Sequence, residues 1–143
     1  MESGIFSAPR DTAWTMSQEN VEILRRAYAA FNRHDWDAAL EAVHPDVEWH
    51  QITQFPDRAI YRGRDEMRDR FWNQQLVEQF GDFRIEVEEF VDAGDHVVML
   101  GQIIATGSAS GVPIRLRVVN ALEMHDGKII RAYDVAGPSV SAI

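Results

Sequence analysis

Cysteine is absent from this chain, and no long hydrophobic run interrupts its mixed composition. The lack of cysteine excludes disulfides, thiolate catalysis and cysteine-ligated zinc, and it fits a cytoplasmic protein. No stretch approaches the roughly 18 apolar residues of a membrane-spanning helix. Residues 1–15 lack the basic start and apolar centre of a secretory signal. We therefore expect a cytoplasmic protein.

Basic residues are scarce compared with acidic ones. The chain has 14 lysines and arginines against 23 aspartates and glutamates, which gives a formal net charge of −9. Nucleic-acid binding needs a surplus of positive charge on one face, because the phosphates must be neutralised. Binding to an anionic membrane surface requires the same surplus of basic residues. We expect neither nucleic acid nor a membrane as a partner.

Motifs for metal, phosphate and acyl-enzyme chemistry are also missing. No two histidines have the His-x-x-x-His spacing, so the sequence predicts no metal site and no cofactor. The Gly/Ser segment 107–111 does not lead from a strand into a helix, which argues against a phosphate-binding loop. The Gly-x-Ser-x-Gly turn of hydrolases does not occur.

The residues that are present show helical periodicity in the first half of the chain. After Ser17, a good N-cap, one apolar stripe recurs every three or four residues: Val21, Leu24, Tyr28 and Phe31. A second short helix is predicted from the N-cap Asp35, with a stripe at Trp36, Leu40 and Val43, and Pro45 is expected to end it.

A third helix is predicted over residues 65–80. The chain is expected to enter this helix at residues 60–65, and Gly81 is predicted to follow its C-terminus. Its inner side is predicted to carry Met67, Phe71 and Gln74 or Gln75, with Trp72 beside them.

Strand periodicity dominates the second half. A first strand is predicted at 47–52, and further strands at 83–88, 96–106, 113–124 and 129–135. Turns are expected at 93–95, 107–111 and Asp126-Gly127, the last being a strong hairpin signal. The sequence therefore predicts an α+β fold: three helices and one strand, then a four-stranded antiparallel meander. Residues 1–15 are expected to be a flexible, dispensable lead-in, and residues 16–143 a single domain.

The chain resembles the SnoaL-like polyketide cyclases of the nuclear transport factor 2 and ketosteroid isomerase superfamily. The resemblance rests on short segments spread over residues 16–134: 17–22, 30–35, 44–49, 61–64, 92–95 and 126–129. It implies a cone-shaped, curved, mostly antiparallel sheet wrapped on about three N-terminal helices, with an internal pocket. It also implies a helical tail, from which residues 135–143 depart.

The resemblance does not extend to two known catalytic designs of that superfamily. An ungapped comparison with ketosteroid isomerase places Gln51 where the base would be and Ala27 where the oxyanion-donating tyrosine would be. Glutamine cannot take a proton at neutral pH, and alanine donates no hydrogen bond. Epoxide hydrolases use an Asp–Arg–Asp set, but no aspartate lies beside Arg115 and Arg117.

Two residues are the candidate catalytic groups. Asp134 matches the late-strand aspartate that the cyclases use, and an aspartate in an apolar cone could shuttle a proton. The alternative is that it caps a strand end in solvent. His50 could exchange a proton near neutral pH. Because His50 alternates with Trp49, only one of the two faces the cone, and the sequence leaves open which.

The expected function is proton transfer on a hydrophobic small molecule, as in a cyclase, isomerase or dehydratase. The candidate pocket residues are Tyr28, Trp49, Trp72 and Asn120. The alternative is a non-catalytic ligand-binding or dimeric scaffold domain with the same cone. Residues 96–104 are apolar on both sides of their strand, which predicts a homodimer through the outer face of the sheet.

Overall fold

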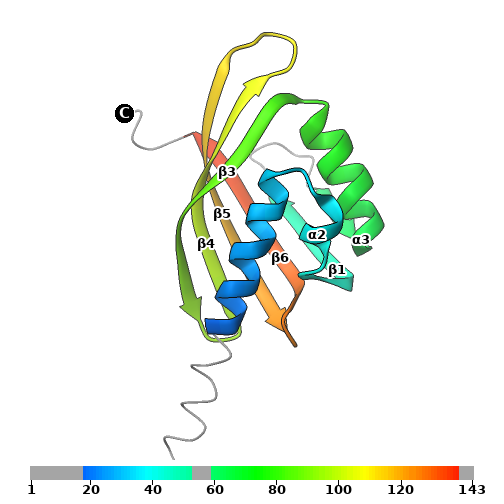
Figure 1. The fold of residues 1–143 in the computed structure, drawn as a ribbon, viewed down its shortest axis with the longest axis vertical. Helices are drawn as coiled ribbons and strands as arrows, with labels where there is room; N and C mark the ends of the chain where they lie inside the picture. Colours follow the sequence, from blue (N-terminus) through cyan, green and yellow to red (C-terminus); the bar gives the residue numbers. More distant parts are fainter. Residues whose placement is uncertain (1–17, 53–58, 139–143) are drawn as a thin grey trace, which may run out of the picture.

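The computed structural model describes residues 18–52 and 59–138, so Ser17 and the 1–15 lead-in lie outside the described residues. A first helix spans residues 18–32. It is followed by α2 (Trp36–Leu40), β1 (Val43–Ile52), β2 (Ala59–Arg62), α3 (Gly63–Glu66), the π-helix η1 (Met67–Val77), β3 (Phe80–Ala93), β4 (His96–Gly107), β5 (Pro113–His125) and β6 (Lys128–Pro138) (Figure 1).

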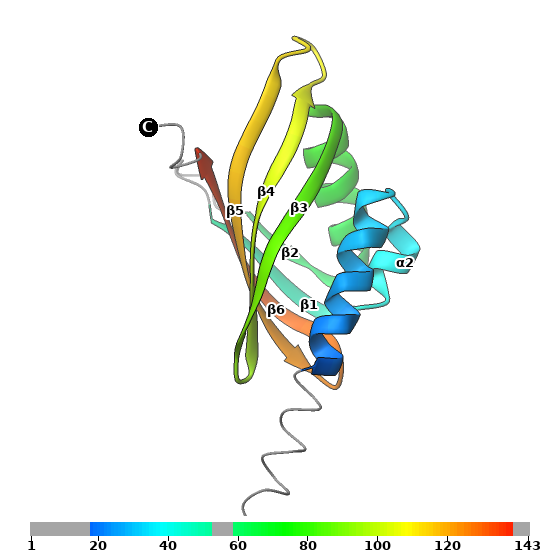
Figure 2. The same cartoon turned by 60° about the vertical axis from the view of Figure 1, so that its left-hand side comes forward.

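The strands form one six-stranded sheet in the order β2-β1-β6-β5-β4-β3. Strand β1 runs parallel to β6, and every other neighbouring pair is antiparallel. Figures 1 and 2 show the sheet curving around the helices, which all lie on its concave side. The predicted α+β class with a curved, mostly antiparallel sheet is confirmed. Within the described ranges, no helix is long and apolar enough to cross a bilayer.

The core lies between the helices and the concave face. Leu24 of the first helix is fully buried, and four further apolar residues are buried with it: Phe31, Leu40, Phe71 and Phe83. Trp36 is only partly buried and packs against the edge of this cluster. The predicted helical stripes therefore give the correct inner faces for the first two helices.

The predicted end of the second helix is wrong. Helix α2 stops at Leu40, and β1 already begins at Val43, so Pro45 lies inside a strand. The pairing of β1 with β6 shifts register between Val43 and Glu48. Proline lacks a backbone N–H and is tolerated in strands at such irregularities.

The short strand β2 was not predicted. Its residues were expected to lead into a helix, but Ala59–Arg62 pairs with β1 as an edge strand. Four residues are too few to show a clear alternation. The helix starts at Gly63, whose φ of +83° favours glycine.

The third helix has an unexpected period. Residues Met67–Val77 form a π-helix, in which hydrogen bonds join residues five apart. Phe71 and Leu76 therefore face the sheet, whereas Gln74 and Gln75 are exposed. The prediction that one of these glutamines lies on the inner side is wrong because it assumed 3.6 residues per turn. Gly81 lies in β3, not after a helix.

The predicted hairpin turns are confirmed. Asp126 and Gly127 have φ values of 52° and 74°, as the tight turn between β5 and β6 requires. Gly94 has a φ of 83° in the turn between β3 and β4. The 129–135 strand extends three residues further, to Pro138.

Candidate functional site

A cavity lies between the helices and the concave face of the sheet. The cavity has a volume of about 90 Å³. Its walls come from the first helix, η1 and the inward side chains of the sheet, and most are aromatic or aliphatic. The lining residues used below are Tyr28, Trp49, Gln51, Trp72, Asn120 and Asp134.

Asp134 stands in the middle of a polar row across the concave face. It lies on β6, with Asn120 opposite it on β5 and Gln51 opposite it on β1. Side chains at opposed positions of neighbouring strands project from the same face, so all three line the cavity. Asp134 is 9% exposed and Asn120 2% exposed, which places an ionisable group inside an apolar chamber.

Both carboxylate oxygens of Asp134 accept hydrogen bonds. Asn120 Nδ2 donates to Oδ1 at 2.9 Å, and Trp49 Nε1 donates to Oδ2 at 3.3 Å. Tyr28 Oη from the first helix donates to Asn120 Oδ1 at 2.5 Å. The tyrosine therefore orients the amide so that its NH₂ group meets the carboxylate.

Burial is the main influence on these ionisable groups. Loss of hydration raises the pKa of Asp134 from 3.8 to about 6, and the bonds from Trp49 and Asn120 reduce the increase. Burial, with the nearby Asp134 charge, also raises the pKa of Tyr28 well above its ordinary value. Tyr28 therefore stays protonated and donates, while Asp134 can gain or lose a proton near neutral pH.

A second tyrosine–amide pair lies on the β1 side of Asp134. Tyr61 Oη donates to Gln51 Oε1 at 3.3 Å. Burial raises the pKa of Tyr61, the Arg70 charge lowers it and the Asp134 charge raises it, the result being an increase. The ring of Tyr61 is stacked on Phe71, with centroids 4.7 Å apart and planes 4° apart.

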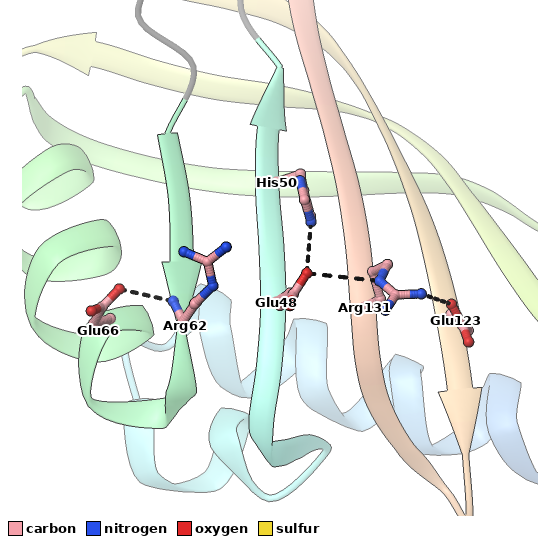
Figure 3. Close-up of polar contacts among 6 residues, drawn as sticks. All are labelled: Glu48, His50, Arg62, Glu66, Glu123 and Arg131. Atoms are coloured by element: carbon pink, nitrogen blue, oxygen red, sulfur yellow. Dashed lines mark hydrogen bonds and ion pairs between the residues drawn. The ribbon is translucent and has the colours of Figure 1, made fainter.

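His50, one of the two candidate catalytic residues, does not face the cavity, and Trp49 is the inward residue of the pair. Its neighbour Trp49 points inward, and alternation along β1 turns His50 to the outer face. There His50 Nε2 lies 3.2 Å from Glu48 Oε1, and its ring stacks on Tyr133. Figure 3 shows His50 beside Glu48 and Arg131.

The other predicted pocket residues all line the cavity: Tyr28, Trp49, Trp72 and Asn120. The sequence comparison indicated only that Gln51 cannot act as a base. Gln51 lies two residues after Trp49 on the same strand, so alternation could have placed it on the inner face as well. Tyr61 was not predicted as a site residue, because the strand that carries it, β2, was not predicted either. Among the described residues, no group of three or more histidine, aspartate or glutamate side chains could hold a metal ion.

The SnoaL-like domain matches residues 24–132, about three quarters of the chain. The chain belongs to the SnoaL-like family. The match spans the cavity walls from the first helix to β6 and stops two residues before Asp134. In this SnoaL-like chain, the residues of the polar row therefore lie in the family domain or at its edge. No curated protein shows detectable sequence similarity to the chain.

Solved structures of similar fold include three informative relatives. A nuclear transport factor 2-like protein of unknown function from Burkholderia pseudomallei is 25% identical, with a TM-score of 0.70 over 81% of this chain and 88% of that one. TerC, co-crystallised with polyporic acid, is 27% identical, with a TM-score of 0.72 over 87% and 94%. IdmH, a putative polyketide cyclase from Streptomyces antibioticus, is 22% identical, with a TM-score of 0.69 over 82% and 91%, and shows the shared fold alone.

Proposed function

We propose that this SnoaL-like protein binds a hydrophobic small molecule in the cavity and that Asp134 exchanges a proton with it. A cyclase, an isomerase or a dehydratase would use such a step. One observation carries the proposal: a buried carboxylate with a pKa raised to about 6 lines a mostly apolar cavity. A general base works best when its pKa is near the working pH, because it is then both ionised and basic.

The surroundings of Asp134 suit a reversible proton carrier. Trp49 and Asn120 fix the plane of the carboxylate, and each oxygen keeps a lone pair that can accept a proton from a ligand. The apolar walls exclude water. The electrostatic attraction between the carboxylate and the acidic hydrogen of the ligand is therefore stronger than it would be in water. After the ligand rearranges, the protonated Asp134 can return the proton to another atom.

The nature of the ligand is supported by the lining and by one relative. Aromatic side chains such as Trp49, Phe71 and Trp72 form much of the wall and suit flat, ring-shaped molecules. TerC, which has the same fold, was crystallised with polyporic acid. We infer that the ligand of this protein is a ring compound.

Hydrogen–deuterium exchange tests the proton transfer without knowledge of the natural substrate. Indanone and tetralone would be incubated with the protein in D₂O, and loss of the proton signals beside the carbonyl would be followed by NMR. We expect the protein to accelerate exchange, and Asp134→Asn to lower the acceleration by a factor of about 100 or more. Exchange that is equally fast in Asp134→Asn would contradict the proposal.

His50→Gln is the matched control for this experiment. It changes an ionisable residue on the neighbouring strand, but one that points to the outer face. Its exchange rate should equal that of the unmodified protein. The second candidate function, a non-catalytic binding domain, is favoured by the mostly apolar cavity lining. It predicts that ring compounds bind without any accelerated exchange.

We also propose that the chain forms a homodimer through the outer face of the sheet. Tyr133 and Val135 of β6 are 38% and 46% exposed on this face. Apolar neighbours on β4 and β5 extend the patch in the same register: Val98, Leu100, Val119 and Ala121. A row of charges lies beside the patch, with Arg131 between Glu48 and Glu123 (Figure 3). An apolar centre with a charged border is typical of protein interfaces.

A further inference from the structure

Gln51 occupies the position on β1 that lies directly beside Asp134. The two residues are opposed in the parallel pairing of β1 and β6, and both line the cavity. Neighbouring strands lie about 4.8 Å apart, so an atom held by the Gln51 amide would also be within reach of the carboxylate. Asn120, on the other side, already uses its amide to hold Asp134. Gln51 is therefore the amide of this row that is placed for a ligand.

The orientation of the Gln51 amide is set by Tyr61. Tyr61 Oη donates to Oε1, which turns the carbonyl end of the amide toward a residue that does not line the cavity. The donor end, Nε2, then points the other way. The tyrosine ring is itself held, since it stacks on Phe71 and the Arg70 guanidinium lies over it at 5.5 Å from its centroid.

We propose that Gln51, oriented by Tyr61, donates a hydrogen bond from Nε2 to a carbonyl oxygen of the ligand. This assigns the ligand class: a fused-ring ketone whose carbonyl lies against Gln51 and whose adjacent C–H lies against Asp134. The catalytic half of this assignment rests on the proton transfer proposed above. The binding half stands on the placement of Gln51 alone.

The resulting step is balanced. Asp134 takes the proton from the carbon next to the carbonyl, the C–H electron pair forms a C=C bond, and the carbonyl π electrons move to the oxygen. Gln51 Nε2 donates to the oxyanion that forms, as side-chain amides do in other oxyanion sites. Asp134 then returns the proton to carbon or to oxygen, and no oxidant or further reactant is needed.

Ligand pairs that differ only in the carbonyl test the assignment. Calorimetry would measure binding of indanone against indane, tetralone against tetralin and fluorenone against fluorene. The unmodified protein should prefer the ketone in these pairs. Gln51→Leu should weaken ketone binding by about threefold to tenfold, the effect of one neutral hydrogen bond, and leave hydrocarbon binding unchanged. Gln51→Met, which keeps the unbranched shape without the donor, should behave in the same way.

Tyr61→Phe tests the orienting role. It keeps the Gln51 amide and the aromatic ring but removes the hydroxyl, so we expect the same selective loss of ketone binding to a smaller extent. Thermal melting would establish that each variant is folded, and Gln51→Met serves if Gln51→Leu does not fold. If no pair shows a ketone preference that depends on Gln51, the assignment is overturned. If the preference is present but exchange at tetralone persists in Asp134→Asn, the proposed proton transfer fails while the role of Gln51 stands.

Discussion

Asn120 Nδ2 donates a hydrogen bond of 2.9 Å to Asp134 Oδ1 across adjacent strands. Both residues are buried, so each depends on the other for a partner that water would otherwise supply. The bond holds the carboxylate in place and partly offsets the desolvation that raises its pKa. The geometry of this pair therefore controls both the stability and the acidity of the cavity.

The contribution of Asp134 to folding stability should decrease as the pH rises, whereas most carboxyl groups in folded proteins contribute more at higher pH. Its pKa is raised from 3.8 to about 6 in the folded protein, so the folded state binds this proton more tightly than the unfolded chain. The stabilisation is fully present below pH 3.8, decreases as the pH rises toward about 6, and is lost above it. The whole change corresponds to about 3 kcal/mol.

Urea unfolding of the protein and of Asp134→Asn would measure this contribution. Other groups titrate in both proteins, so the difference between the two free energies of unfolding isolates Asp134. We expect the free energy of unfolding of the variant, relative to that of the unmodified protein, to increase by about 2 kcal/mol between pH 4 and pH 7. Curves that run parallel over this range would show that Asp134 is not desolvated in the fold.

Asn120→Leu should change both the acidity and the stability of the site. It removes a donor that lowers the pKa of Asp134, so that pKa should rise further and exchange should reach half of its maximal rate at a higher pH. The variant also leaves the Tyr28 hydroxyl without its acceptor. We expect a loss of about 1–3 kcal/mol in the free energy of unfolding.

Two further measurements separate these effects. The pH profile of tetralone exchange reports the acidity, and urea unfolding reports the stability. Tyr28→Phe is the control, because it removes the same Tyr28–Asn120 bond but keeps the Asn120–Asp134 bond. An Asn120→Leu profile identical to that of Tyr28→Phe would contradict a direct influence of Asn120 on the carboxylate.

Val135→Glu should prevent dimer formation. The substitution places a charge in the exposed apolar patch on β6, where a symmetric partner would bury it twice. Sedimentation velocity at micromolar concentration should show a dimer for the unmodified protein and a monomer for the variant. Val112→Glu is the control, since Val112 is 55% exposed in the turn between β4 and β5. If the unmodified protein sediments as a monomer, the proposed interface is refuted.

Gly101→Ala should destabilise the curved sheet. A Cβ at this position of β4 would collide with the backbone carbonyl oxygen of Glu86 and approach Met99 Sδ to 3.1 Å. Backbone cannot move aside as a flexible side chain can, so we expect a cost of about 1–3 kcal/mol. Gly81→Ala in β3 is the matched control, because its nearest neighbour would lie at 3.6 Å. Thermal melting of both variants compares them directly, and equal melting temperatures would contradict the clash.

Local patterns predicted a large part of the fold. Two-residue alternation located β3 and β5, a long apolar run located β4, and Asp126-Gly127 marked the turn between β5 and β6. The sequence also indicated Asn120 as a candidate pocket residue, and Asn120 lines the cavity. These features depend on neighbours in the chain, since side chains one or two positions apart determine which face is buried.

The errors occurred where pairing and packing between segments decide the structure. Strand β2 forms by pairing with β1, and the inner face of η1 follows a period of five that its own residues do not indicate. The choice between Trp49 and His50 also lay beyond the sequence. Either residue satisfies the alternation, and the packing of Trp49 against Phe71 and Asp134 selects the inward one.

The sequence by itself determined the α+β class, the family resemblance and an aspartate late in the chain, because composition, periodicity and turn residues are local properties. Only the tertiary structure decided that Asp134 is buried and that Gln51 and Asn120 stand on either side of it. That arrangement depends on a parallel pairing between strands about eighty residues apart in the chain. The register of that pairing, and the loss of water around one carboxylate, give the site its chemistry.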